Sequence, residues 1–315
     1  MELIRGLSGL RARHRPCVAT IGAFDGVHRG HRAVVDQLLE QAREHDLPPT
    51  VVTFEPHPRE YLQRQQAPAR LTTLREKVEV LGGAGVARLL YLRFDETLRQ
   101  MDPQAFIDAV LLRGIGVRAL ILGDDFRFGR GRAGDSDMIR DAGRRGGFVT
   151  LPTATRQHLG ERISSTRIRT ALAAGDFALA EALLGRPYSF SGRVIHGRRL
   201  GREIGTPTAN IALGRRVAPL SGVFAVSVRG ACLSAAPAVA NVGTRPTVDT
   251  AARPTLEVHV FDLDRDLYGQ RLQVTFHHKL RDEQRFASVD ALRAQIHADR
   301  DGARDWFAAR GETPA

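Results

Sequence analysis

The chain has 315 residues, of which 43% are hydrophobic and 26% charged, a composition typical of globular proteins and a length that suits two domains. Its two cysteines, Cys17 and Cys232, lie far apart and near no CxxC or Cys/His cluster, which excludes a disulfide framework and a zinc site. No apolar run approaches the ~20 residues of a membrane span, and the first residues lack the apolar stretch of a secretion signal. We therefore expect a cytoplasmic protein without a membrane anchor.

The net charge of +11 makes a nucleic-acid partner one interpretation of this sequence. The basic residues are spread over the whole length, however, and no basic run is interleaved with the aromatic side chains on which single strands stack. The pattern favours solvated arginines together with some contacts to anionic small molecules. We therefore expect no nucleic-acid partner.

Strands and helices alternate through the first half of the chain. Apolar runs predict strands at residues 18–21, 51–54, 89–92, 119–123 and 148–151. Helices are expected from residue 33, from Thr73 with its capping-box pattern, from Asp102-Pro103, and over residues 166–172. The alternation indicates a parallel sheet with helices on both faces, in which ligands bind beyond the carboxyl ends of the strands.

The pattern changes after residue 185, and we place a domain boundary there, between residues 1–185 and 186–315. Short strands with glycine-rich turns follow, at residues 190–195, 223–228, 256–261 and 272–276. Strands without intervening helices predict a small antiparallel barrel, and a last helix is expected over residues 289–306. The fold class is therefore α/β, with a parallel-sheet domain followed by a small barrel domain.

Residues 22–31 read GAFDGVHRGH and stand between a predicted strand and a predicted helix. A helix N-terminus offers unpaired N–H groups and a partial positive charge, so it favours phosphate, and glycines let the backbone approach closely. His28 and His31 are three residues apart and could donate to the same phosphate chain. The segment has neither the Lys and Ser/Thr of a Walker A loop nor the GxGxxG spacing of a dinucleotide fold. It predicts a nucleotide site of another type, unless the two histidines are only polar residues at a helix start.

Three further segments lie where a site in such a sheet is assembled. They read TFEPHP over residues 53–58, GDDFRFG over 123–129 and ISSTRIR over 163–169. The hydroxyl residues from Ser164 to Thr166 are natural N-caps, and that could be their whole role. Two arginines in the same helical turn, where acidic residues are usually preferred, indicate an anion there. His57, between two prolines, could equally be an ordinary turn residue.

A glycine-rich segment opens the second domain and reads GRRLGREIGTPTAN over residues 197–210. Its glycines recur every fourth residue between predicted strands, which indicates either a loop around a ligand or a hairpin connection. Glu257 lies on a predicted strand whose apolar residues alternate to the opposite face. It is either an exposed strand residue or a carboxylate that accepts a proton from a substrate hydroxyl.

The four segments of the first domain and the PTAN segment of the second resemble, in order, those of the bacterial bifunctional riboflavin kinase/FAD synthetases. The resemblance extends from about Cys17 to Phe307 and implies a Rossmann-like nucleotidyltransferase domain followed by a riboflavin kinase barrel. It implies two reactions, phosphorylation of riboflavin by ATP to FMN in the second domain and adenylylation of FMN by ATP to FAD and pyrophosphate in the first. Mg²⁺ is the implied cofactor, and ATP the implied co-substrate.

The resemblance also implies a role for each matching residue. In the first domain, His28 and His31 are its catalytic residues, and ATP is bound by Gly22, Phe24, His28, His31, Ser165, Thr166 and Arg169, with His57 and Asp125 near the nucleotide or flavin. In the second domain, Glu257 is the catalytic residue, the ATP site includes Gly197, Gly201, Gly205, Thr208 and Asn210, and the last two bind Mg²⁺. Ala23 departs from the family, many of whose members have Asn there, which puts a side-chain contact at this position in doubt.

Two alternatives stay open at this point. The nucleotidyltransferase segments alone would suit transfer to another phosphorylated substrate, although the PTAN segment argues against it. The other alternative is a non-catalytic flavin-binding or nucleic-acid-binding protein with degenerate sites, which the intact histidines, PTAN segment and Glu257 disfavour.

Overall fold

The computed structural model describes residues 1–64, 66–123, 126–197, 206–230, 232–245 and 253–311. Packing divides the chain into two compact units. The first unit comprises Met1–Pro68 and Leu74–Ser164, and the second comprises Ala69–Thr73 and Ser165–Ala315. Each unit has its own sheet and its own core.

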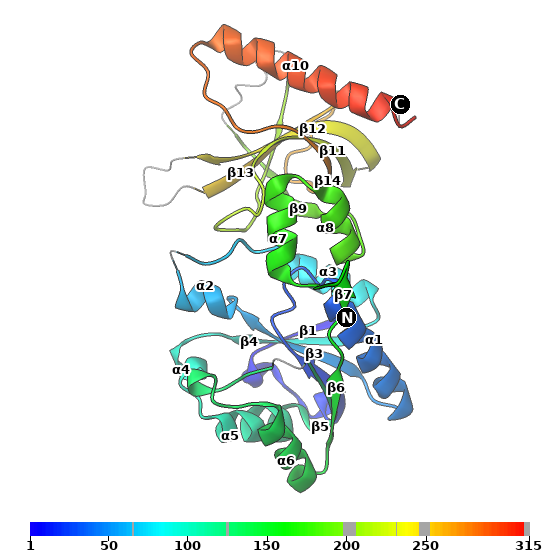
Figure 1. The fold of residues 1–315 in the computed structure, drawn as a ribbon, viewed down its shortest axis with the longest axis vertical. Coiled ribbons are helices and arrows are strands. Elements are labelled where there is room, and N and C mark those ends of the chain that lie inside the picture. The colour runs from blue at the N-terminus through cyan, green and yellow to red at the C-terminus, as the bar shows by residue number, and fades with distance from the viewer. Residues whose placement is uncertain (65, 124–125, 198–205, 231, 246–252, 312–315) are drawn as a thin grey trace. The chain divides into compact units, whose positions relative to one another are not determined.

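The first unit is built on a parallel six-stranded sheet in the order β1-β4-β3-β2-β5-β6 (Figure 1). Its strands are β1 (Glu2–Arg5), β2 (Cys17–Ile21), β3 (Pro49–Glu55), β4 (Arg88–Arg93), β5 (Val117–Gly123) and β6 (Val149–Thr153). The five strands and the parallel sheet expected from the apolar runs are confirmed. The sequence did not predict β1, because four residues at the sheet edge show too little alternation to be distinguished from a loop.

Helices cover both faces of this sheet. They are α1 (Arg29–Glu44), α2 (Pro58–Leu62), α3 (Leu74–Gly83), α4 (Glu96–Arg99), α5 (Pro103–Phe106), the π-helical segment η3 (Ile107–Ile115) and α6 (Ser136–Gly146). Short elements complete the unit: the 3-10 turns η1 (Leu7–Gly9), η2 (Ala12–His14) and η4 (Arg130–Arg132), and the strand pair β7 (Gln157–His158) and β8 (Glu161–Arg162). Asp102 caps α5 as expected, since its carboxylate accepts the Gln104 N–H at 2.8 Å.

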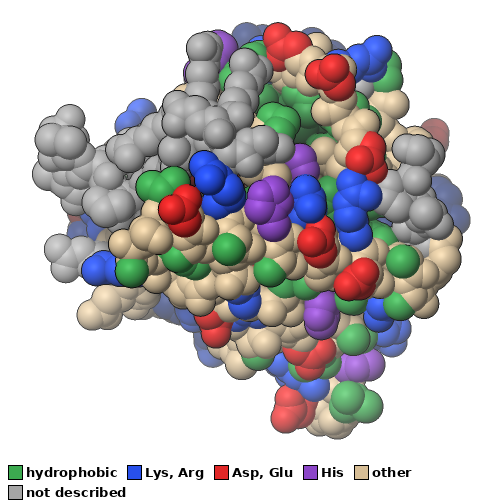
Figure 2. Space-filling view, turned by 90° about the horizontal axis from the view of Figure 1, so that it is seen from above, with side chains coloured by type: hydrophobic (Ala, Val, Ile, Leu, Met, Phe, Trp, Pro, Cys, Tyr) green, Lys and Arg blue, Asp and Glu red, His purple; other side chains and the backbone are tan. Residues whose placement is uncertain are grey.

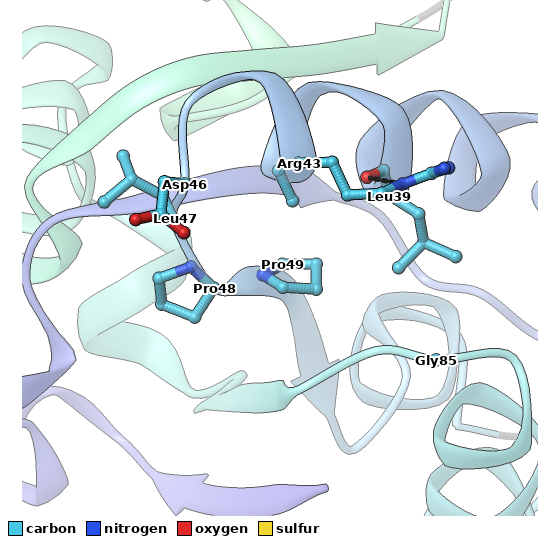
Figure 3. Close-up of a pocket in the computed structure, with 8 residues that line it drawn as sticks. Leu39, Arg43, Asp46, Leu47, Pro48, Pro49 and Gly85 are labelled. Carbon is cyan, nitrogen blue, oxygen red and sulfur yellow. Dashed lines mark hydrogen bonds between the residues drawn. The ribbon is translucent and has the colours of Figure 1, made fainter.

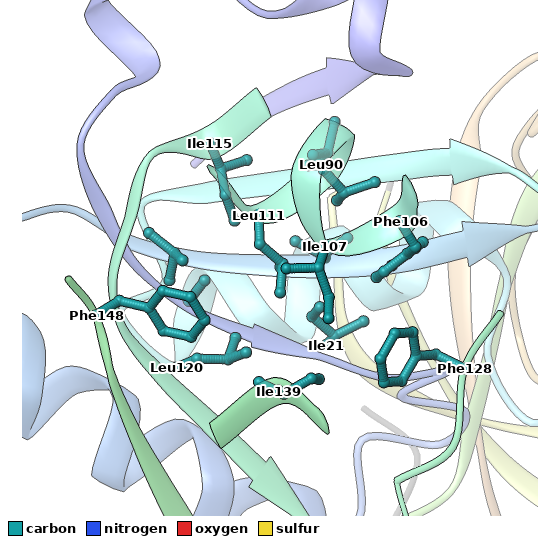
Figure 4. Packing of buried hydrophobic residues seen from close by; sticks show 14 of the residues in the cluster. Ile21, Leu90, Phe106, Ile107, Leu111, Ile115, Leu120, Phe128, Ile139 and Phe148 are labelled. Carbon is teal, nitrogen blue, oxygen red and sulfur yellow. The ribbon is translucent and has the colours of Figure 1, made fainter. Parts of the chain in front are cut away.

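Successive residues of the central strands point into two different cores. Leu120 and Leu122 of β5 belong to the core shown in Figure 4, which they share with Phe106, Ile107 and Ile139 from the helices on that face. The intervening residues Ala119 and Ile121 belong to the core on the other face, with Val35 and Leu38 of α1 and Leu81 of α3. This period of two, with both faces apolar, is what a buried parallel sheet requires. A ligand site is therefore expected at the ends of the strands and in the loops that follow them.

The second unit is a closed antiparallel barrel with the strand order β10-β13-β12-β11-β14-β9 (Figure 1). Its elements are α7 (Ser165–Ala174), α8 (Phe177–Leu184), β9 (Ser189–Ile195), β10 (Ala209–Ile211), β11 (Gly222–Gly230), β12 (Leu233–Arg245), β13 (Arg253–Val260), β14 (Arg271–Arg281) and α10 (Val289–Ala308). The Phe276 ring lies 5.1 Å from the Phe190 ring and 5.3 Å from the Phe224 ring, and all three side chains are buried. The predicted barrel and its terminal helix are confirmed.

By packing, the chain divides between Ser164 and Ser165, so the helices before residue 185 belong to the second unit. Helix α8 brings the Phe177 ring within 5.8 Å of Phe224 and 6.3 Å of Phe276, so α7 and α8 pack with the barrel. A change of sequence pattern marks where helices stop alternating with strands, but it does not reveal which sheet the last helices pack against. The assignment of residues 1–185 and 186–315 to separate activities stays a prediction.

On the face drawn in Figure 2, acidic and basic side chains are interspersed and form no large patch of one charge. A dispersed charge of this kind is expected of solvated arginines. Among the helices of the described segments, none combines the length and the apolar character needed to cross a bilayer.

The two free cysteines offer a matched test of burial. Cys17 lies on β2 with a side chain that is fully buried, whereas Cys232 is exposed. Burial raises the pKa of the Cys17 thiol to about 11, against opposing effects of Thr50 and Arg88. Because the thiolate is the reactive form, we expect native protein at pH 7.5 to incorporate one alkyl group per chain, at Cys232. Intact-mass measurement checks this; C232S should incorporate none until it is unfolded, and alkylation of native C232S would contradict the packing of β2.

Candidate active sites

The segment 22–31 forms the turn from β2 into α1, at the carboxyl end of a central strand. β2 pairs with β3 on one side and with β5 on the other. Within the turn, Phe24, Gly26 and Val27 have positive φ values of 47°, 83° and 42°. A left-handed Phe or Val costs roughly 1–3 kcal/mol and persists only where its surroundings impose it, which is common at ligand sites.

The two histidines of the turn are held against each other. His28 is the N-cap of α1, and its Nδ1 accepts the backbone N–H of His31 at 3.2 Å. The two rings stack at 3.7 Å between centroids, and the Phe24 ring lies 5.0 Å from His31. Because Nδ1 of His28 is an acceptor, the proton of its neutral ring is on Nε2. The structure thus brings Phe24, His28 and His31 together at a helix start whose first turn carries no acidic residue.

Two glycines make this arrangement possible. A Cβ on Gly22 would lie 3.0 Å from the Phe24 ring, and one on Gly30 would lie 3.1 Å from the His28 ring. The same position on Gly30 lies 3.7 Å from the Ile163 carbonyl oxygen. The chain that leads into the Ser164–Arg169 segment therefore passes next to Gly30.

The residues Ser165, Thr166 and Arg169 begin α7 in the second unit. The predicted helix start is confirmed, one residue earlier than expected. Arg169 donates its Nε–H to the Ala69 carbonyl at 2.5 Å, which ties α7 to the short segment Ala69–Thr73 of the same unit. Part of the Arg169 guanidinium therefore has a structural role, and the binding of ATP by these three residues stays a prediction.

His57 also serves as a helix cap. It follows β3, and its Nδ1 accepts the Arg59 N–H at 3.1 Å at the start of α2. This is the turn role that was the alternative reading of the sequence, and a contact to nucleotide or flavin remains untested. The predicted site residues Asp125, Gly201 and Gly205 lie outside the described residues.

In the second unit, the strand register aligns three polar side chains. Asn210 of β10 is paired with Glu257 of β13, and Glu257 is paired with Asn241 of β12. Paired residues of antiparallel strands share a face, and these three side chains are half-buried. Their neighbours Leu256 and Val258, each 1% exposed, point to the barrel interior. The carboxylate of Glu257 is therefore flanked by two amides on the outer face of the barrel.

The PTAN segment is attached to the same face. Nδ1 of His259 lies 2.9 Å from the Pro207 carbonyl oxygen, next to Thr208. Burial lowers the pKa of His259, the bond to Pro207 opposes this shift, and Arg300 and Arg304 add to it. The ring is therefore neutral at pH 7, and its Nδ1–H donates to Pro207. Residue 259 stands two positions after Glu257 on one strand, so the two side chains share a face.

Thr208 and Asn210 fit the Mg²⁺ of ATP that the resemblance implies. Their side chains supply a hydroxyl and an amide oxygen, and hard oxygen donors suit Mg²⁺. A Cβ on Gly197 would overlap the Asn210 amide, so glycine at this position provides the space in which that amide lies.

Two charged residues that are not among the predicted site residues lie near these sites. A Cβ on Gly243 would overlap the Glu283 carboxylate, so Glu283 lies next to Gly243 of β12. Lys77 of α3 is buried behind the turn at Ala23. One signal was available for Lys77, since only two of the 46 Lys and Arg residues are lysines.

A hollow of about 520 Å³ lies beside the first sheet (Figure 3). It is lined by Leu39, Ala42, Arg43, Asp46, Leu47, Pro48, Pro49 and Gly85, from the end of α1, the start of β3 and the loop after α3. The hollow therefore lies at the amino end of β3, whereas ligands of open parallel sheets bind at the carboxyl ends.

The capping role of His28 is open to a direct test. H28A removes the acceptor for the His31 N–H and should lower the free energy of unfolding of the first unit by about 1 kcal/mol. H28N keeps a side-chain acceptor at the N-cap and should remain close to wild type. Urea unfolding of both variants checks this, and equal loss in the two would show that the ring packing, and not the cap, is the stabilising contact.

Comparison with known proteins accounts for both units. A family model described as FAD synthetase matches residues 10–167, and one described as riboflavin kinase matches residues 184–307. The bifunctional riboflavin kinase/FMN adenylyltransferase of Pseudomonas fluorescens is 52% identical to this chain over 304 residues, and the match covers 96% of this chain and 97% of that protein. The protein of the same name from Escherichia coli K12 is 50% identical over 308 residues, and the match covers 98% of each chain. A solved structure from Streptococcus pneumoniae described as a macrolide-efflux protein has a TM-score of 0.78 and 28% identity, covering 97% of this chain and all of its own. The chain belongs to the family of bifunctional riboflavin kinase/FMN adenylyltransferases.

Proposed function

We propose that the chain makes FAD from riboflavin in two ATP-dependent steps at two separate sites. The face of the barrel that carries Glu257 phosphorylates riboflavin to FMN, and the turn at residues 22–31 takes part in the transfer of an adenylyl group to FMN. The match of two different family models to successive parts of the chain carries this proposal. The same match disfavours adenylylation of another phosphorylated substrate, because a kinase that makes FMN accompanies the adenylyltransferase. Two free cysteines suit the cytoplasm in which we propose that it works.

Adenylyl transfer requires two anions to approach each other. The FMN phosphate attacks the α-phosphorus of ATP, the bond to the β-phosphate oxygen breaks, and pyrophosphate leaves. No protein nucleophile is needed, so the protein contributes by orienting the phosphates and by stabilising the charge of the transition state. Nε2–H of His28, His31 and the N–H groups at the start of α1 are the donors we propose for this task. Ser165, Thr166 and Arg169, which match the family at a second helix start, are proposed to bind phosphate as well.

Phosphorylation of riboflavin requires removal of a proton from an alcohol. We propose that Glu257 orients the riboflavin hydroxyl and accepts its proton as the oxygen attacks the γ-phosphorus of ATP, while the bond from that phosphorus to the β-phosphate oxygen breaks and ADP leaves. Asn210 and Asn241, its cross-strand neighbours, keep the carboxylate in a polar setting. Thr208 and Asn210 would hold Mg²⁺, which when bound would neutralise charge on the ATP phosphates. His259 contributes by holding Pro207, and with it the start of the PTAN segment.

The direct test follows both reactions in one vessel. The protein is incubated with riboflavin, ATP and Mg²⁺, and flavins are separated by chromatography over time. FMN should appear first and FAD after it, with ADP and pyrophosphate as the other products. Absence of both flavin products would overturn the proposed function.

Removing both imidazoles of the turn should separate the two activities. In the H28A/H31A double variant we expect FAD formation from supplied FMN to be lost, because the phosphate donors are gone. Riboflavin phosphorylation should continue at the wild-type rate and report that the second unit is folded. FAD synthesis at the wild-type rate in this variant would exclude residues 22–31 as the adenylyltransferase site.

The complementary variant is E257Q. It retains the size and shape of the side chain but replaces a carboxylate oxygen with an amide NH₂ and cannot accept a proton, so riboflavin kinase activity should fall by at least ~100-fold. Conversion of supplied FMN to FAD should be unchanged. If E257Q lost both activities to the same extent, the two reactions would not have separate sites.

A further inference from the structure

A buried ammonium group lies behind the turn at residues 22–31. The side chain of Lys77, on α3, is only 4% exposed. Its Nζ donates to the Ala23 carbonyl at 2.6 Å and to the Thr53 hydroxyl at 3.2 Å. Thr53 is fully buried on β3, and its hydroxyl also donates to the Ala23 carbonyl, at 3.2 Å. One backbone oxygen of the turn is thus held by side chains from a helix and a strand.

The choice of lysine at this position is informative. The chain has 46 Lys and Arg residues, and only Lys77 and Lys279 are lysines. Burying an ammonium is costly unless its donors are satisfied, so such a residue persists where its contacts repay that cost. A compact ammonium on an unbranched stem can reach a carbonyl in a packed interior, whereas a planar guanidinium needs more room. In a chain that uses arginine almost everywhere, lysine at residue 77 points to a specific requirement for that shape.

Fixing the Ala23 carbonyl also fixes the peptide that follows it. In a planar trans peptide the C=O and the next N–H point in opposite directions. With the oxygen of Ala23 directed inward to Lys77, the N–H of Phe24 is directed away from Lys77. Phe24 itself has a φ of 47°, a conformation that its surroundings must impose. The contact uses only the backbone of residue 23, so it does not depend on the side chain at that position.

We propose that Lys77 is a positioning residue of the adenylyltransferase: through the Ala23 carbonyl it holds the 22–31 turn in the shape that presents its N–H groups and histidines to phosphate. This inference rests on the proposed assignment of that turn to ATP. The positive charge behind the turn adds to the field of the α1 N-terminus, and both favour an anion. Lys77 acts through Ala23 and does not itself contact the substrate.

The test compares four variants in both reactions. K77M removes the ammonium and keeps a long apolar stem, T53V removes the second donor with little change of shape, and T53S restores the hydroxyl. K279M is the matched control, because it makes the same substitution at the other lysine, which pairs with Asp282 in the second unit. For each variant, kcat and KM for FMN adenylylation, riboflavin kinase activity and far-UV circular dichroism are measured well below the unfolding temperature.

We expect K77M to lower kcat of FAD formation by about 10- to 100-fold, the effect of displacing reacting groups by about 1 Å. KM for FMN should change less than about threefold, because a turn that orients phosphates affects the reacting geometry more than flavin binding. Kinase activity and circular dichroism should be unchanged. T53V should lose part of kcat, T53S should recover it, and K279M should adenylylate FMN like wild type.

Two results would overturn the inference. One is a K77M protein with wild-type kcat, and the other is a loss of both activities together with the circular dichroism signal, which would make Lys77 a general stabiliser. If K77M does not fold, T53V decides, since reduced kcat with intact kinase activity supports the inference and wild-type kcat overturns it. FAD synthesis in H28A/H31A would instead remove the proposed site, whatever the Lys77 variants show.

Discussion

The first unit depends on holding a strand-to-helix turn in a left-handed conformation. Phe24 and Val27 each cost roughly 1–3 kcal/mol there, and both side chains are buried, at 2% and 3% exposed, in the core that includes Val35 and Leu38. Burying an apolar side chain of this size contributes roughly 1.5–3 kcal/mol, so hydrophobic burial is of the right size to offset the strain. The turn is thereby shaped before a phosphate arrives, and its donors need no reorganisation on binding.

In the second unit, strand register positions the polar side chains of the candidate site. Pairing of β10, β13 and β12 places Asn210, Glu257 and Asn241 side by side, while the residues between them fill the barrel. A shift of one residue in β13 would exchange its two faces and bury the carboxylate. Burial of Leu256 and Val258, each 1% exposed, therefore secures the register of β13 as well as the stability of the barrel.

Local patterns revealed the elements whose signal is contained in their own residues. The buried strands β2 and β5, the capped helices and the glycine-rich turn at 22–31 were all recognisable from periodicity, caps and glycines. Strands β10 and β12 were not, because β10 has three residues and β12 is rich in alanine, which has little preference for a strand. The packing of α7 and α8 with the barrel also had no local signal, since it depends on where Phe177 finds its aromatic neighbours.

The sequence by itself determined the fold class, the two kinds of domain and the motifs that resemble those of the family, because periodicity, capping and short motifs are properties of neighbouring residues. The tertiary structure alone decided which groups surround those motifs. It showed the stacking of His28 on His31, the placing of Glu257 between two amides, and the buried Lys77 against the backbone of a turn 54 residues away. The last two join residues that are distant along the chain and that only the folded sheets bring together, and the stacking of the two histidines depends on the shape that the folded turn takes.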